Sequence, residues 1–153
     1  MSETEDRLKH IDALLADYGS HHRARGNIVC HVFGVTLIVF GITSMLEEFR
    51  IGPFRAAEVL MSAVFLYYVT LDLRLAVGML LVFVVIAFAA RAAADWRVGL
   101  GAFVVGWIFQ AVGHALYEKN RPAFFRNLVH LLVGPLFLVN ELLKVRRVAP
   151  LPR

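Results

Sequence analysis

Residues 28–45 of the chain read IVCHVFGVTLIVFGITSM and contain no charged side chain. A helix of this length extends about 27 Å, which is close to the thickness of the hydrocarbon core of a membrane. The chain as a whole is apolar, since 59% of its 153 residues are hydrophobic, more than in an ordinary soluble domain. The stretch therefore predicts a transmembrane helix within a membrane protein.

Further apolar runs follow this stretch. Asp72 and Arg74 interrupt a long apolar region at a point that one continuous helix would place in mid-membrane, so we expect a helical hairpin there. The last run contains His130, Asn140 and Glu141 and is the weakest candidate for a full crossing. We predict an all-α fold: a polytopic membrane helix bundle in one domain, with four transmembrane helices and a re-entrant or interfacial C-terminal helix. The transmembrane helices are expected at residues 28–45, 56–71, 75–90 and 98–116, and the last helix at residues 128–143.

The segment before the first transmembrane helix, residues 1–26, is polar and carries several acidic side chains, unlike a signal peptide. Within it, Leu8, Ile11 and Leu14 recur at helical spacing. This pattern predicts a short amphipathic helix on the membrane surface, followed by Asn27 as the N-cap of the first transmembrane helix.

The distribution of basic residues predicts the orientation, because loops rich in Lys and Arg remain cytoplasmic. Four crossings place twelve of the sixteen Lys and Arg residues inside, whereas five crossings divide them equally. Both termini of this integral membrane protein are therefore expected in the cytoplasm. The composition favours a bacterial plasma membrane, or the endoplasmic reticulum if the source is eukaryotic. The oligomeric state is left open.

Several functional classes have no support in the sequence. Cys30 is the single cysteine, so neither an intramolecular disulfide nor a CxxC motif can form. The net charge of +4 comes from scattered basic residues, which predicts contact with membrane lipid and not with nucleic acid. Motifs typical of phosphoryl transfer, serine hydrolysis and dinucleotide binding are missing.

The expected topology gathers histidines on one side of the membrane. The start of the first helix and the end of the fourth share that side, so His21, His22 and His31 can meet a second group of polar residues. That second group comprises His114, Glu118 and His130, with Gln110, His114 and Glu118 aligned by their four-residue spacing. Imidazole with carboxylate suits Fe(II) or Zn(II), and two histidines with one carboxylate are common in non-haem iron oxygenases.

Other interpretations of these histidines remain open. A histidine at a membrane interface often bonds only a loop carbonyl, and the chain could be a non-catalytic membrane scaffold or lipid-binding protein. Haem ligation by two histidines is a third interpretation, but it needs a porphyrin-sized cleft that so short a bundle does not predict. The metal hypothesis depends on the convergence of several histidines.

The polar segments at the two helix ends carry a family resemblance. They are residues 18–22 (YGSHH), Asn27 and 31–34 (HVFG) in one block, and 110–114 (QAVGH) and 118–123 (EKNRPA) in the other. Together these blocks resemble the small membrane 2-hydroxy fatty acid dioxygenases, a family long catalogued as a domain of unknown function that includes an enzyme of fatty-acid α-oxidation. The resemblance implies an iron(II)-dependent dioxygenase, with Fe(2+) as cofactor. It implies that a 2-hydroxy long-chain fatty acid and O2 give CO2 and the fatty acid one carbon shorter.

Carried over by position, the resemblance implies that His22, His31 and His114 are catalytic metal ligands. It implies Glu118 as a fourth ligand or as an outer partner that fixes a histidine tautomer. Gly26 replaces the family's more usual proline-containing turn. Secondary site residues are Tyr18, Asn27, Gln110, Arg121 and His130.

The substrate suggests two further expectations. Arg121 or Lys119 is a hypothetical partner of its carboxylate. Apolar walls formed by Phe33, Phe103, Trp107 and Phe109 are expected to recognise the acyl chain without strict length selection, so that a range of chain lengths reacts.

Overall fold

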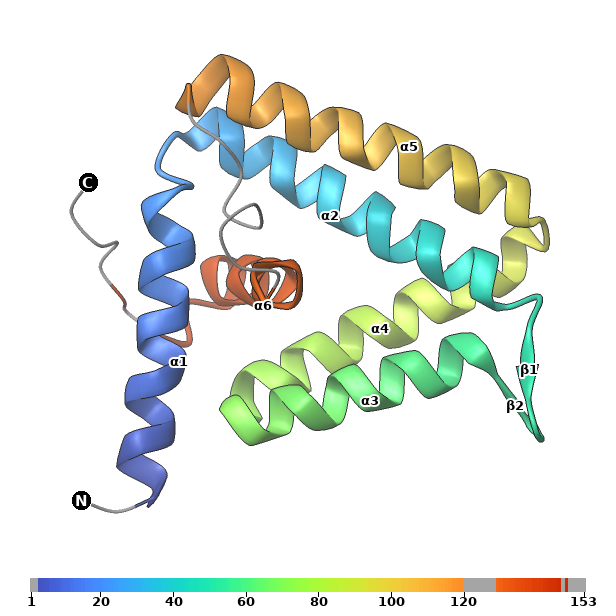
Figure 1. The fold of residues 1–153 in the computed structure, drawn as a ribbon, viewed down its shortest axis with the longest axis horizontal. Helices are drawn as coiled ribbons and strands as arrows, with labels where there is room; N and C mark the ends of the chain where they lie inside the picture. The colour runs from blue at the N-terminus through green and yellow to red at the C-terminus, as the bar shows by residue number, and fades with distance from the viewer. Residues whose placement is uncertain (1–2, 120–128, 147, 149–153) are drawn as a thin grey trace.

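The structure is a computed structural model that describes residues 3–119, 129–146 and 148. It is all-α apart from one small hairpin (Figure 1). The helices are α1 (Glu3–Ser20), α2 (Arg25–Leu46), α3 (Ala56–Leu71), α4 (Leu73–Ala93), α5 (Trp96–Val112), a π-helix η1 (Gly113–Glu118) and α6 (His130–Leu143). The two-residue strands β1 (Arg50–Ile51) and β2 (Phe54–Arg55) form the hairpin, an element that the sequence analysis missed.

Four helices form two layers, with the remaining two helices at one end (Figure 1). Helices α2 and α5 lie side by side in one layer, and α3 and α4 form the hairpin predicted around Asp72. The Asp72 side chain caps α4 by accepting hydrogen bonds from the N–H groups of Arg74 (2.9 Å) and Leu75 (3.0 Å). Helices α1 and α6 lie crosswise to these layers, and Figure 1 views α6 nearly along its axis.

Small residues bring α2 and α5 into close contact. A Cβ on Gly34 would lie 2.9 Å from the carbonyl oxygen of Gly106, and one on Gly41 would lie 2.5 Å from that of Gly99. The same pattern continues seven residues earlier in α2 and seven residues later than Gly106, at the first residue of η1: a Cβ on Gly113 would lie 2.4 Å from Oδ1 of Asn27. The helices are thus in antiparallel register at seven-residue intervals, as in other closely packed helix pairs.

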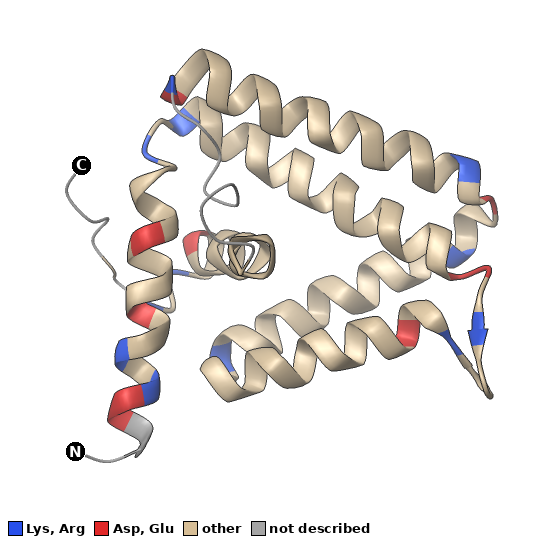
Figure 2. Ribbon diagram, in the orientation of Figure 1, with Lys and Arg blue, Asp and Glu red and all other residues tan. Residues whose placement is uncertain are grey.

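Three helices are long and apolar enough to cross a membrane: Arg25–Leu46, Leu73–Ala93 and Trp96–Glu118. Helices α3 and α6 are apolar but shorter. In α2, α3, α4 and α5 the charged residues lie toward the helix ends and leave an uncharged belt between them, whereas α1 carries charges along its length (Figure 2). Large side chains such as Leu66, Leu81 and Phe88 remain exposed. The apolar helices indicate membrane association, while the fourth crossing stays a prediction.

Two local details differ from the expectation. Helix α2 begins at Arg25 with Ala24 as its N-cap, so the prediction of Asn27 as N-cap is wrong. The fourth apolar run ends in a π-helix, in which the N–H group of Lys119 donates to the carbonyl of His114 (2.8 Å). This wider turn falls next to the predicted site, where π-helical turns are often found.

A partly buried ion-pair network connects α1, the α3–α4 turn and the segment that follows α6. The Arg146 guanidinium donates to both carboxylate oxygens of Asp12, at 2.6 and 2.8 Å, and to Oδ2 of Asp72 at 2.9 Å. The backbone N–H of Arg146 also donates to the Asn140 side chain (2.8 Å). The hydrogen bonds to Asp12, more than any other cause, raise the pKa of Arg146.

Candidate metal centre

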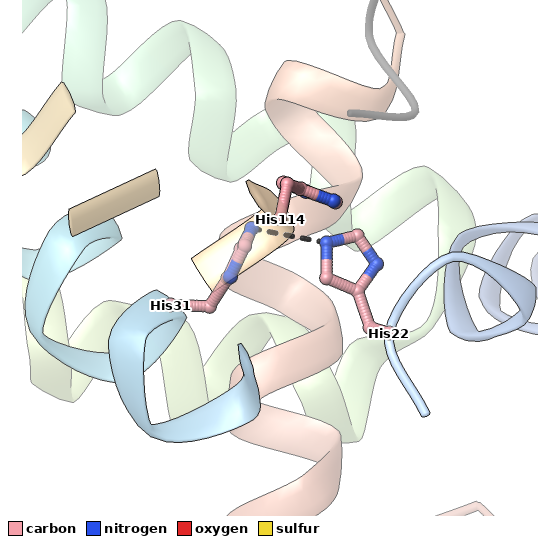
Figure 3. A group of neighbouring side chains, drawn as sticks. All are labelled: His22, His31 and His114. Carbon is pink, nitrogen blue, oxygen red and sulfur yellow. Dashed lines mark hydrogen bonds between the residues drawn. The ribbon is translucent and has the colours of Figure 1, made fainter. Parts of the chain in front are cut away.

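Three histidines converge where α1, α2 and η1 meet, as Figure 3 shows. Each of His22, His31 and His114 offers a ring nitrogen, and these three nitrogens lie within 4.8 Å of one another. All three side chains are buried, at 2–4% exposure. We call these three residues the histidine cluster; it brings together the three histidines that the sequence analysis placed first.

Local structure fixes two of the rings. His22 lies in the loop after α1, stacked on Tyr18 with ring centroids 4.0 Å apart, and its Nδ1 lies 2.7 Å from the Tyr18 carbonyl oxygen. His31 lies in α2, and its Nδ1 lies 2.9 Å from the carbonyl oxygen of Asn27, one turn earlier. A carbonyl can only accept a hydrogen bond, so both Nδ1 atoms carry the proton.

This tautomer has a consequence for the facing nitrogens. With Nδ1 protonated, Nε2 of a neutral imidazole carries a lone pair, and the Nε2 atoms of His22 and His31 lie 3.0 Å apart. Burial, and then the neighbouring His31, lower the pKa of His22 from 6.5 to about 2, so His22 is neutral. Two facing lone pairs repel unless a cation lies between them.

A divalent metal ion fits this arrangement. Two nitrogens that each bond such an ion at about 2.1 Å, at right angles, would lie about 3.0 Å apart, which matches the observed separation. The backbone carbonyls that hold His22 and His31 are the usual outer partners of metal-binding histidines. A set of neutral imidazoles suits borderline ions such as Fe(II) and Zn(II).

Glu118 is not one of the three residues that share this space. Its Oε1 accepts hydrogen bonds from the backbone N–H groups of Arg23 and Ala24, the latter at 2.6 Å. The carboxylate, 6% exposed, therefore ties the end of η1 to the loop that carries His22. Its role as a direct ligand stays a prediction.

The other predicted residues lie around the histidine cluster. His130 is buried, with Nε2 3.0 Å from the Asp17 carboxylate, and its ring meets the Tyr18 ring edge-on. Nδ1 of His21 instead approaches the carbonyl of Asp17 and the hydroxyl of Ser20. Lys119 is exposed and ends η1. The predicted role of Arg121 lies outside the described residues.

A cavity of about 420 Å³ opens from the histidine cluster and extends between the two layers of helices. His22, His31 and His114 line it at one end, while Ile42 and Thr43 line it far along α2. Most of its remaining lining is aliphatic or aromatic. Of the four expected apolar wall residues, Phe103 and Trp107 line the cavity, but Phe33 and Phe109 do not. A slender apolar molecule with a polar head would match this space.

Polar groups along the cavity fall into two kinds. Away from the histidine cluster, the Tyr68 hydroxyl donates to the carbonyl of Leu132 (2.6 Å) and the Thr43 hydroxyl to that of Val39 (2.8 Å). Near the cluster, Nε2 of the buried Gln110 has no hydrogen-bond acceptor among the described residues. A buried N–H donor without an acceptor is costly, and its position indicates a site for a polar ligand.

Sequence reasoning missed the residues that position the site. It did not predict that Asp17 would lie beside His130, that Tyr68 would join α3 to α6, or that Arg146 would connect three elements. The sequence did contain a signal for the close packing of α2 against α5. Gly34 and Gly41 are seven residues apart, and the glycines of α5 repeat this spacing.

Fold and site together define a helical, membrane-associated protein with a histidine cluster at the end of an apolar cavity. The profile of the 2-hydroxy-palmitic acid dioxygenase Mpo1-like family matches residues 8–146, and the chain belongs to this family. It is 35% identical over 141 residues to the 2-hydroxy-palmitic acid dioxygenase MPO1 of Saccharomyces cerevisiae, covering 89% of this chain and 81% of the yeast protein. No solved structure matches the chain.

Proposed function

We propose that the protein is a non-haem iron(II) dioxygenase of fatty-acid α-oxidation. It converts a 2-hydroxy fatty acid and O2 to the fatty acid one carbon shorter, CO2 and water. The observation that carries this proposal is the set of three buried histidines, two with facing lone pairs, at the mouth of an apolar cavity. The name of the yeast relative, a 2-hydroxy-palmitic acid dioxygenase, supports the substrate class.

In this proposal His22, His31 and His114 would hold the iron, which would supply the means to activate O2 and a positive charge near the polar head of the substrate. The carbonyls of Tyr18 and Asn27 keep the two Nδ1 protons in place, so that Nε2 faces the ion.

Two further side chains support the substrate and the loop. Glu118 acts as a tether for the loop that carries His22, because its Oε1 accepts two backbone N–H groups of that loop. The Gln110 amide donates a hydrogen bond to an oxygen of the substrate's head group. The acyl chain lies in the apolar cavity, which excludes water from the reacting carbons.

The decisive experiment is elemental analysis of detergent-purified protein kept anaerobic with iron(II), beside the His22→Ala, His31→Ala and His114→Ala variants. We expect stoichiometric iron in the parent, loss of iron in the variants, and oxygen uptake by the parent with 2-hydroxypalmitate. A metal-free parent, with variants that fold equally well, would overturn the proposal. The protein would then be a lipid-binding scaffold.

We also propose four crossings with both termini in the cytoplasm. The charged ends and uncharged belt support this arrangement (Figure 2). Helix α6 lies crosswise to the other helices (Figure 1), as an interfacial or re-entrant helix would. Thiol labelling of intact cells tests it: a cysteine replacing Glu48 should react with an impermeant reagent, and one replacing Glu5 should not. The reverse pattern contradicts the orientation.

A further inference from the structure

One face of α2 forms a continuous wall of the cavity. His31, Val35, Val39 and Thr43 follow one another at four-residue intervals, and all four line the cavity. Residues at this spacing share one side of a helix. The stripe therefore begins at a residue of the histidine cluster and continues through two valines to Thr43.

Of the residues of α2 that line the cavity, Thr43 is the farthest along the chain from the histidine cluster. Ile42 and Phe103 line the cavity near Thr43. Phe103 packs closely against Gly41, because a Cβ added to Gly41 would lie 2.8 Å from the Cβ of Phe103. One turn beyond Thr43, the buried Glu47 carboxylate lies 3.4 Å from Nε of Arg91 and joins the end of α2 to α4. The two layers of helices are thus held together beyond this point.

The stripe has a length that can be compared with an acyl chain. Thr43 follows His31 by twelve residues, which corresponds to about 18 Å along the helix. An extended chain gains about 1.3 Å per carbon, because its C–C bonds of about 1.5 Å meet at tetrahedral angles. About fourteen carbons therefore fit between the histidine cluster and Thr43, beyond the carboxyl carbon and the carbon that bears the hydroxyl.

We propose that the stripe on α2 is a length gauge, with the histidine cluster as its zero point and Thr43 at its far end. This length gauge rests on the proposed function, which places the hydroxyl and carboxyl groups of the substrate at the histidine cluster. Chains of up to about sixteen carbons lie fully inside the cavity, and longer chains must bend or leave it at a cost for every carbon. Selection by length follows, in place of the broad range expected from the sequence.

The gauge can be shortened in steps. A phenylalanine at Thr43 fills the far end, and one at Val39 fills the cavity about 6 Å nearer to the histidine cluster. In turnover assays with 2-hydroxy acids of graded length, Thr43→Phe should lower the longest accepted chain by about four carbons, and Val39→Phe by about four more. Turnover of 2-hydroxypalmitate should fall by about tenfold or more, while acids short enough to fit remain within about twofold of the parent.

The matched control is Thr36→Phe. Thr36 lies on the same helix and makes the same hydrogen bond to the carbonyl four residues earlier, but it is exposed and lines no part of the cavity. Its length profile should equal that of the parent. The opposite change, Phe103→Ala, should admit longer chains, a gain that a folding defect cannot imitate.

A second measurement separates this proposal from the proposed function. Saturated fatty acids without the 2-hydroxyl can be tested for displacement of a fluorescent fatty acid from metal-free protein. Shortening of the preferred length in Thr43→Phe and Val39→Phe supports the gauge even if no turnover occurs. Equal length profiles in these variants and Thr36→Phe overturn the gauge, even if the parent holds iron and is active.

Discussion

The histidine cluster and the Arg146 network are both sets of polar side chains from distant parts of the chain. They differ in whether each hydrogen-bond donor faces an acceptor. In the Arg146 network, a guanidinium is matched by the carboxylates of Asp12 and Asp72, so donors face acceptors. In the histidine cluster, Nε2 of His22 faces Nε2 of His31, so one lone pair faces another.

This difference separates a structural role from a binding role. Matched charges inside a protein contribute to holding elements together and need nothing from outside. Facing lone pairs lower stability until a cation arrives, which indicates that the site serves a ligand. Gln110, whose buried Nε2 faces no acceptor among the described residues, belongs with the histidine cluster in this respect.

The largest expected effect concerns the histidine cluster. His31→Ala should lower iron affinity by about a hundredfold or more and abolish oxygen uptake, because it removes a ligand as well as one lone pair. The metal-free variant should unfold at a temperature no lower than the metal-free parent. Metal content and thermal unfolding in detergent test both statements, and unchanged iron in the variant would remove His31 from the site.

The next effect concerns the Arg146 network. Arg146→Met should lower the free energy of unfolding by about 3 kcal/mol, because the buried Asp72 would keep its two backbone hydrogen bonds but lose the guanidinium that balances its charge. Iron bound per folded molecule should not change. The exposed Arg74 provides the control, since Arg74→Met should leave stability within about 0.5 kcal/mol of the parent. Equal stability of the two variants would show that the network contributes little.

A smaller effect tests the tether. Glu118→Gln keeps an oxygen that can accept the N–H groups of Arg23 and Ala24 but removes the charge, and should cost about 1 kcal/mol of stability. Full iron stoichiometry is expected in this variant. If it instead loses iron to the extent that His31→Ala does, Glu118 is a direct ligand.

The smallest effect concerns Gln110. Gln110→Leu removes a buried Nε2 donor that has no acceptor among the described residues, so stability should rise by about 1 kcal/mol. The KM for 2-hydroxypalmitate should increase by about two- to tenfold through loss of one hydrogen bond. A higher unfolding temperature with an unchanged KM would assign the amide no part in substrate binding.

The sequence predicted the helices well because a lipid environment, which offers no hydrogen bonds to the backbone, constrains apolar segments strongly. Apolar runs in a membrane must form helices, and the bounds of α3 at Ala56–Leu71 coincide with the expected residues 56–71. Charged residues at 72–74 fixed the hairpin in the same way. The ends were predicted less well: Asn27 lies inside α2, and η1 replaces the regular helix after Val112, because tertiary contacts decide where a terminal turn changes pitch.

The candidate site was predicted only in part. Alternating crossings bring the start of α2 and the end of α5 together, which was enough to place His21, His22, His31 and His114 on one side. The family resemblance then implied His22, His31 and His114 as the metal ligands. The orientation of Glu118 could not be predicted, since residues one turn apart can turn to different partners. The pairing of Asp17 with His130 and of Arg146 with Asp72 joins elements whose crossing angles no spacing in the sequence encodes.

The sequence by itself determined that this protein is helical and apolar, and it predicted that the histidines at the ends of its apolar helices lie close together. The reason is that hydrophobic length and charge position act locally along the chain. Tertiary structure alone decided that three of the six histidines converge and that a cavity extends from them to Thr43. These features depend on the close approach of α2 and α5 at their glycines and on the separation of the two layers, which are properties of packing between distant segments.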